Sequence, residues 1–106
     1  MVVKERVGRN RYIAFRIEGG EDLQAGEVKA ALREASWHEP KEARPWLVRF
    51  RTGAGIVRVS HLHKDTALRL LRSLQRVAAR RVTVRTLGTT GTVRGAIRKY
   101  LEPPDP

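Results

Sequence analysis

Hydrophobic and polar residues alternate with a period of two in four stretches of the chain, and this period is typical of β-strands buried on one face. The stretches are residues 11–18, 46–51, 56–60 and 82–87. The link between the second and the third stretch, residues 52–55, contains two glycines. So short a glycine-rich link predicts a β-hairpin.

Three other stretches carry apolar residues at intervals of three and four positions, which is the period of an amphipathic helix. The first helix is expected over residues 22–37. The second is expected to be capped by Asp65 or Thr66 and to continue to Arg80. Its buried stripe would be Leu70, Leu71, Leu74, Val77 and Ala78. The third is expected over residues 92–101.

The order of these elements, βαββαβ followed by a last helix, predicts an α+β sandwich of the ferredoxin-like or RNA-recognition-like type. In this fold a four-stranded antiparallel sheet is covered on one face by two crossover helices. Residues 11–101 are expected to form this single domain. The flanking segments are expected to be a flexible basic arm, residues 1–10, and a frayed proline-rich tail, residues 102–106.

The alternation divides the expected sheet into a face toward the helices and an open face. Residues expected toward the helices are Ile13, Phe15, Ile17, Trp46, Val48, Phe50, Val57, Val59, Val82 and Val84. Residues expected on the open face are Arg16, Arg49, Arg51, Arg58 and Arg85, together with Tyr12, Ala14, Leu47, Ile56 and Leu87. Its apolar members indicate that the last helix or a partner protein covers part of it. Neighbouring arginines repel one another and favour an anionic partner, although a merely solvated face is the alternative.

The net charge of the chain points to a polyanionic partner such as a nucleic acid. The 106 residues include 22 lysines and arginines against 11 acidic residues, for a net charge of +11 and a pI near 11.4. Seventeen of the cations are arginines, whose planar guanidinium holds a phosphate with two hydrogen bonds. An arginine-rich proteome would explain arginine over lysine, but not the twofold excess of cations.

Cysteine usage and hydropathy exclude several classes of protein. The absence of cysteine excludes disulfides, thiolate metal sites and cysteine nucleophiles. No apolar run approaches the length of a membrane span or of a signal peptide core. We therefore expect a cytoplasmic protein without membrane contact.

The GTTGT segment, residues 88–92, is a second candidate for an anion site. Its glycines allow close approach of the backbone, and the helix that follows begins with unpaired N–H groups. Arg94, Arg98 and Lys99 lie in the next turns. The segment lacks the spacing of a P-loop, and a plain capped turn is the alternative.

Catalytic patterns are weak by comparison. His61 and His63 have too few neighbouring ligands for a metal site. Ser60 lies outside any G-x-S-x-G elbow, and the scattered acidic residues form no pair suited to two-metal chemistry. A small ferredoxin-like hydrolase would need an Asn at an anion loop, whereas the single Asn, Asn10, lies in the arm. We expect no catalytic residue and no metal or cofactor bound by the protein.

Three segments resemble a known family. They are residues 11–17 (RYIAFRI), residues 55–60 (GIVRVS) with the leucine-rich helix that follows, and residues 86–101 (TLGTTGTVRGAIRKYL). All three are similar to archaeal ribonuclease P protein component 2, which has a small eukaryotic counterpart in ribonucleases P and MRP. The last is the most specific, because the family has a Ser-Gly-Thr turn before a basic helix. Here Thr90 stands in the serine position and keeps the hydroxyl.

The resemblance implies a non-catalytic subunit of ribonuclease P, an RNA-based endoribonuclease that removes 5′ leaders from precursor tRNA. The implied partners are the ribonuclease P RNA, which would hold the active site and the Mg²⁺, and a barrel-type protein subunit. Precursor tRNA would be contacted only indirectly. Family members also have an RNA-recognition-like sheet with extra helices.

Charge and the turn identify the residues expected to bind RNA. They are Arg9, Arg11, Arg16, Arg49, Arg51, Arg58, Arg85, Thr89, Thr90, Gly91, Thr92, Arg94, Arg98 and Lys99. Leu47, Ile56 and Leu87 are expected to face a partner protein. Because the third strand has no aromatic residue, contacts to phosphates of structured RNA are favoured over base stacking. The alternative function is a stand-alone RNA-binding protein or RNA chaperone, and self-association of the isolated chain is left open.

Overall fold

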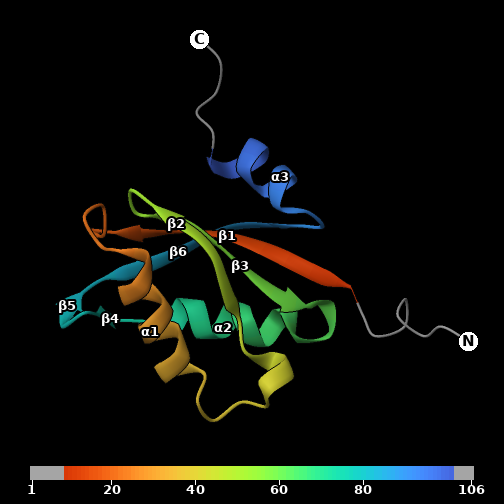
Figure 1. Cartoon of the computed structure of the whole chain (residues 1–106), viewed down its shortest axis with the longest axis horizontal. Coiled ribbons are helices and arrows are strands. Elements are labelled where there is room, and N and C mark those ends of the chain that lie inside the picture. Colours follow the sequence, from red (N-terminus) through yellow and green to blue (C-terminus); the bar gives the residue numbers. More distant parts are fainter. Residues whose placement is uncertain (1–8, 102–106) are drawn as a thin grey trace, which may run out of the picture.

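Four strands form one antiparallel sheet in the computed structural model, which describes residues 9–101 (Figure 1). The strands are β1 (Asn10–Glu18), β2 (Trp46–Arg51), β3 (Ala54–Ser60) and β6 (Thr83–Thr90), in the order β2-β3-β1-β6. Each of the connections β1–β2 and β3–β6 skips one strand and passes through a helix, α1 (Ala25–Ala35) or α2 (Lys64–Ser73). The predicted α+β fold with the βαββαβ order is confirmed.

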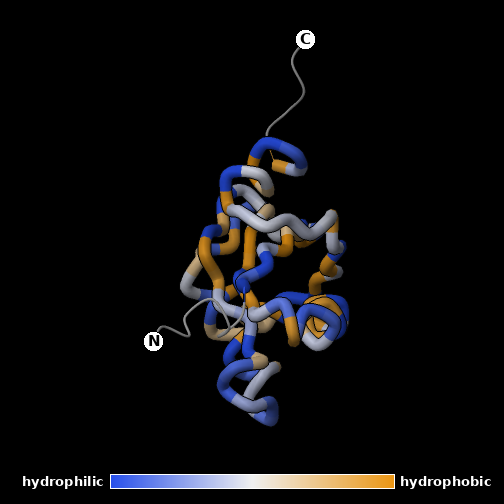
Figure 2. Tube along the Cα trace, turned by 90° about the vertical axis from the view of Figure 1, so that its right-hand side faces the viewer, coloured by the Kyte–Doolittle hydropathy of each residue, from blue (hydrophilic) through white to orange (hydrophobic). Residues whose placement is uncertain are grey.

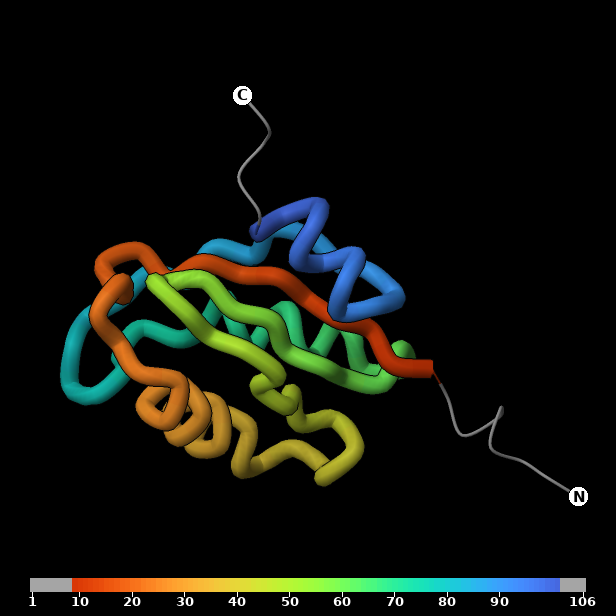
Figure 3. The backbone as a smooth tube through the Cα atoms, turned by 45° about the horizontal axis from the view of Figure 1, so that its top comes forward, coloured from red at the N-terminus to blue at the C-terminus, as the bar shows by residue number. Residues whose placement is uncertain are grey.

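The helices lie on both faces of this sheet. Figure 1 shows α1 and α2 on one face and the C-terminal helix on the other. That helix begins as α3 (Val93–Ala96) and continues as a π-helical turn, η4 (Ile97–Leu101). Figure 3 shows it running over the surface of the sheet. The open face, meaning the face away from α1 and α2, is therefore partly covered by the chain itself.

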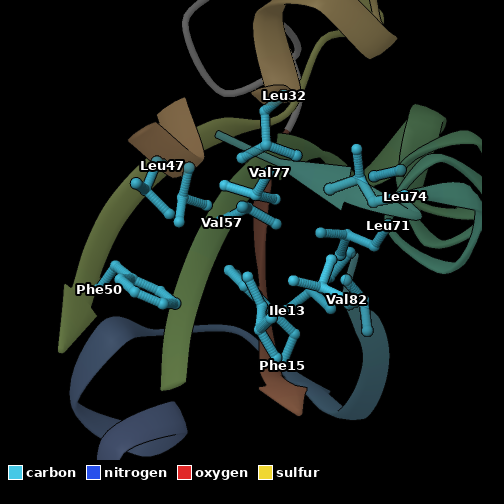
Figure 4. Close-up of a cluster of buried hydrophobic side chains, with 14 of the residues drawn as sticks. Ile13, Phe15, Leu32, Leu47, Phe50, Val57, Leu71, Leu74, Val77 and Val82 are labelled. Carbon is cyan, nitrogen blue, oxygen red and sulfur yellow. The ribbon is translucent and has the colours of Figure 1, made fainter. Parts of the chain in front are cut away.

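The core lies between the sheet and the two crossover helices (Figure 4). Hydrophobic and hydrophilic residues are interspersed along the chain (Figure 2), and successive side chains of a strand point to opposite faces of its sheet. Phe15 and Phe50, both labelled in Figure 4, stack within this core with ring centroids 6.2 Å apart. The central strand β1 contributes three side chains with no exposed surface, those of Ile13, Phe15 and Ile17.

The β2–β3 hairpin turns as predicted, but β2 has a different phase. Its register against β3 shifts between Leu47 and Arg49, which makes Val48 the extra residue of a β-bulge. Leu47 lies opposite Val57 and joins the core. Trp46 is 51% exposed and Val48 37% exposed. The predicted positions of Val48 toward the helices and of Leu47 on the open face are wrong, because strict alternation does not continue through a bulge. Trp46, at the start of the strand, lies within reach of Lys29 of α1.

The second helix is shorter than predicted. It ends at Ser73, and a small hairpin follows, formed by β4 (Arg76–Val77) and β5 (Arg80–Arg81). Ala78 and Ala79 at its turn have φ angles of 53° and 65°, which an α-helix cannot contain. Ala78 is therefore exposed rather than buried, while Val77 still reaches the core from the hairpin.

The helix starts and the outer boundaries also differ from the prediction. A bond from the Gln24 N–H to Glu27 Oε1, 2.8 Å long, closes the first turn of α1. The first turn of α2 includes Asp65, which was a predicted cap, and its N-cap is His63. Asn10, assigned to the arm, is the first residue of β1. Residues 1–8 of the predicted arm and the predicted tail, residues 102–106, lie outside the described residues.

Candidate nucleic-acid interface

Strand register arranges the residues of the open face in rows that cross the sheet. Ala54 of β3 is flanked by Arg51 of β2 and Arg16 of β1, and Arg16 is flanked in turn by Arg85 of β6. We call Arg51, Arg16 and Arg85 the arginine row. All three are exposed, and neighbouring strands are about 4.8 Å apart. The row therefore places three guanidinium groups within reach of a single ligand.

One member of the arginine row has an acidic partner. Arg85 Nη2 lies 2.8 Å from Glu18 Oε2, and both side chains are largely exposed. Exposed pairs of this kind contribute little to stability and are readily exchanged for another anion. Within residues 9–101, no ion pair involves Arg16 or Arg51. Two of the three arginines of the row therefore carry positive charge that no acidic side chain of residues 9–101 compensates.

The next row is apolar and is covered by the C-terminal helix. It contains Ile56, Ala14 and Gly88, which lie opposite one another on β3, β1 and β6. Ile56 and Ala14 have no exposed surface, and neither has Ala96 of α3. The predicted cover of the open face is thus the chain's own last helix.

This burial corrects the predicted protein-partner surface. Leu47 lies in the core and Ile56 lies under the chain's own cover, so neither side chain keeps a surface on which a partner protein can rest. Leu87 is half-buried and keeps part of its surface. The exposed large hydrophobic side chains of the described residues are instead Trp37, Trp46, Val48 and Leu62.

A third row ends the open face on the far side of the helix. Arg58 lies between Trp46 and Tyr12, and Tyr12 lies next to Thr90. Lys29 Nζ of α1 lies 4.2 Å from the centre of the Trp46 ring, a cation–π contact. The neighbouring Arg49 belongs to the row with Ile56 and is half-buried. All five predicted open-face arginines thus occupy open-face register positions.

The hydroxyl groups of the GTTGT segment are used within the turn. Thr92 Oγ1 accepts a bond of 3.0 Å from the Gly95 N–H and caps α3. Thr90 Oγ1 donates to the Thr92 carbonyl over 2.7 Å. Thr89 lies opposite Ile13 and points to the face of the sheet that α1 and α2 cover, away from the arginine row. The geometry is that of a capped turn that directs the chain from β6 onto the open face.

The cations of the last helix face outward. Arg94, Arg98 and Lys99 are exposed, and Lys99 Nζ lies 5.7 Å from the centre of the Tyr100 ring. They share the open side of the molecule with the arginine row, because their helix lies on that face. Where the helix covers the sheet, it therefore presents positive charge of its own.

The two remaining predicted RNA-binding residues are at the start of β1. Arg9 and His61 are joined through their backbones, with the His61 N–H donating to the Arg9 carbonyl over 2.7 Å. The Arg9 N–H donates to His61 Nδ1 over 3.0 Å. Arg11 is half-buried and pairs with Val59, on the side opposite the arginine row. The structure thus separates Arg11 from the cations of the open face.

Sequence patterns missed the arginines of the β4–β5 hairpin, because these residues fitted a helix period. Arg80 binds both carboxylate oxygens of Asp22 and donates to the Gly19 carbonyl over 3.4 Å. The hydrogen bond from Arg80 lowers the pKa of the Asp22 carboxyl below its ordinary value. The same bond raises the pKa of Arg80. Arg76 and Arg81 are exposed on the same hairpin.

Residues 9–101 offer neither a metal-binding cluster nor a membrane-spanning helix. No group of three or more His, Cys, Asp or Glu side chains in that range is arranged to hold a metal ion. None of the helices in the same range is long and apolar enough to cross a bilayer.

A sequence model of the Rpp14/Pop5 family matches residues 11–101. The chain belongs to the Rpp14/Pop5 family. It is 35% identical over 100 residues to the ribonuclease P protein component 2 of Thermococcus kodakarensis, covering 88% of this chain and 83% of that protein. It is 35% identical over 99 residues to the protein of the same name from Methanocaldococcus jannaschii, covering 88% of this chain and 73% of that protein. The chain is also 32% identical over 100 residues to the protein of that name from Pyrococcus abyssi, covering 88% of this chain and 85% of that protein.

The predicted family resemblance is thereby confirmed. The Rpp14/Pop5 match includes the whole arginine row, the GTTGT turn and the C-terminal helix. The cover on the open face is therefore inside the region that aligns with the family, rather than an extension added to it.

Proposed function

We propose that this chain is a non-catalytic subunit of ribonuclease P, which binds the catalytic RNA and supports removal of 5′ leaders from precursor tRNA. The observation that carries the proposal is the arginine row on the open side of a chain whose relatives are named ribonuclease P protein component 2. Ribonuclease P RNA is the implied ligand, and the cytoplasm is the implied compartment.

The proposed RNA contacts are electrostatic. Guanidinium groups bind phosphates through parallel N–H bonds, and every neutralised phosphate releases counterions. Tyr12, the aromatic residue of β1 on the open face, is half-buried, which disfavours base stacking on the sheet. A structured RNA that offers its backbone fits this surface better than an unpaired strand. We assign the contacts to the arginine row, Arg58, and the outward cations of the last helix.

The proposed role in catalysis is to support the RNA, whose bound Mg²⁺ would carry out the cleavage. The chain's own hydroxyl groups near the cations, those of Thr90 and Thr92, are engaged in the turn. A protein partner of the barrel type is part of the proposal. The exposed Trp37, Trp46 and Leu62, rather than Leu47 and Ile56, are available to pack against it.

One observation favours a second function, that of a stand-alone RNA chaperone. The burial of Ile56 and Ala14 by the C-terminal helix leaves the domain complete without a partner. A chaperone would bind RNA with strong salt dependence and little regard for sequence.

Reconstituted cleavage of precursor tRNA tests the proposal. The ribonuclease P RNA and the barrel-type protein are combined at moderate magnesium concentration, with and without this chain. We expect cleavage to depend on the chain, and to be reduced by the double variant Arg16→Gln, Arg51→Gln. Cleavage that is independent of the chain, with tight RNA binding intact, would favour the chaperone.

A further inference from the structure

The β4–β5 hairpin holds two arginines directly opposite each other. Arg76 is the Cα partner of Arg81. The neighbouring pair is Val77 and Arg80, and cross-strand partners stand on the same side of a ribbon. Val77 is 1% exposed and Arg80 reaches Asp22, so that side faces the body of the domain. Arg76 and Arg81 stand on the other side, and both are exposed.

No acidic side chain of residues 9–101 is paired with these two arginines. The ion pairs in that range are formed by Arg69, Arg80 and Arg85. Like charges at directly opposed positions of a ribbon are unfavourable, and an anion between them relieves the repulsion.

The turn of this hairpin is also unfavourable in itself. Ala78 and Ala79 both adopt left-handed backbone angles, which two-residue turns usually reserve for Asn and Gly. The ribbon is nevertheless held in place by Val77 in the core and by the Val82 N–H, which donates to the Gln75 carbonyl over 2.9 Å. Tertiary contacts thus maintain a hairpin that its own turn and its own charges disfavour. Such local strain often marks a functional element.

The arginine pair lies near one end of the arginine row. Val82 and Val84 point into the core, so Arg81 and Arg85 stand on the opposite side of the extended chain. Four residue steps separate them, which is about 13 Å of extended chain. These steps run along the strand direction, whereas the arginine row crosses the sheet, so the pair lies to one side of Arg85 rather than in line with the row.

We propose that Arg76 and Arg81 together clamp the phosphate backbone of an RNA that also contacts the arginine row at Arg85. This inference rests on the RNA-binding function proposed above. Two forked guanidinium groups on adjacent strands bracket phosphate oxygens. The hairpin has no aromatic side chain between residues 75 and 82, so the ligand is the backbone of a structured RNA rather than an unpaired base.

A salt titration of RNA binding tests the clamp. The full chain and its double variant Arg76→Gln, Arg81→Gln are titrated with labelled ribonuclease P RNA at several salt concentrations. We expect the slope of log K against log salt to fall by about 2, one for each phosphate that the variant no longer neutralises. The variant Arg76→Lys, Arg81→Lys keeps the charge and should keep most of the slope. It should bind RNA more weakly, because a lysine ammonium cannot form the two parallel hydrogen bonds of a guanidinium group.

The matched control removes the same charge from α1 and the segment that follows it. Arg33→Gln with Lys41→Gln changes two exposed cations of the helix layer and should leave the slope unchanged. The clamp variant should also unfold at a temperature no lower than the parent chain, because repulsion is removed. A lower unfolding temperature would assign the pair a structural role and overturn the inference.

Site-directed probing separates this inference from the proposed function. Because the chain has no cysteine, Ala79→Cys creates a single attachment point for an iron chelate that cleaves nearby RNA. Localised cleavage supports the clamp. No cleavage and an unchanged slope, with binding still weakened by Arg16→Gln and Arg51→Gln, would remove the clamp and leave RNA binding in place. If neither double variant changes RNA binding, both proposals fail. If the clamp variant loses only its protein partner, an acidic protein segment replaces RNA as the ligand.

Discussion

The ring of Tyr100 occupies the space in which a side chain at Gly88 would stand. A Cβ atom built on Gly88 would overlap the Cζ, Oη and Cε1 atoms of that ring. Tyr100 belongs to the C-terminal helix and Gly88 to β6, so this contact joins the buried Ala96 in seating the helix on the open face. Glycine is required here for close approach, because its φ angle is not in the left-handed region.

Substitution of Gly88 should therefore displace the helix. We expect Gly88→Val to reduce the free energy of unfolding by about 1–3 kcal/mol, the usual cost of overpacking. Urea unfolding measures the reduction, and limited proteolysis within residues 93–101 reports whether the helix has lifted. Gly26→Ala is the control, because a Cβ at Gly26 meets nothing within 4 Å. If the variant is as stable as the parent chain and its helix resists proteolysis, Tyr100 does not need glycine at position 88.

The bulge in β2 makes opposite predictions for two adjacent residues. Leu47 is in the core, so Leu47→Ala should cost about 2–5 kcal/mol of unfolding free energy. Val48 is exposed, so Val48→Ala should cost under about 1 kcal/mol. Urea denaturation of the two variants measures both values. The reverse order of costs would indicate a strand without the bulge.

Removal of two members of the arginine row should weaken RNA binding without unfolding the protein. For Arg16→Gln with Arg51→Gln we expect the salt slope of binding to fall by about 2. The pair Arg33→Gln with Lys41→Gln controls for net charge. Fluorescence anisotropy with ribonuclease P RNA gives the slopes. Equal reductions in both pairs would indicate a diffuse charge effect rather than a specific surface.

The outward cations of the last helix should behave in the same way. For Arg94→Ala with Arg98→Ala we expect weaker RNA binding and a slope reduced by about 2. Circular dichroism should show that the helix is retained, since alanine is a strong helix former. An unchanged slope across the salt series would assign RNA binding to the sheet alone.

The ion pair between Asp22 and Arg80 should anchor the β4–β5 hairpin in a pH-dependent way. The folded-state pKa of Asp22 is lowered, so its contribution is present above the ordinary pKa of 3.8 and is lost as pH falls through the lowered value. Hydrogen exchange at the Val82 amide measures the anchoring. Protection in the parent chain should exceed that in Asp22→Asn at pH 6, and the difference should shrink as the pH falls below 3.8. A difference that persists there would show that charge is not involved.

The sequence alone was sufficient for the fold class, the hairpin at residues 52–53 and the family. These depend on local signals: alternation in β1 and β3, a turn whose Gly53 has a φ of 80°, and motifs that are contiguous in the chain. The sequence also predicted the open-face positions of Arg16, Arg58 and Arg85. In β1, in β3 and in the first half of β6, the side chains alternate between the two faces without interruption.

Tertiary structure decided the phase of β2, the end of α2 and the cover of the open face. A bulge at Val48 depends on how β2 pairs with β3, which no local pattern encodes. Val77 could be a buried residue of a helix or of a β-hairpin equally well. Packing against elements distant in the sequence determines that it belongs to the hairpin. The contact of Tyr100 with Gly88 likewise joins two elements whose meeting depends on the finished sheet. Apolar periodicity specifies which side of an element is buried, but only the packed chain specifies which surface buries it.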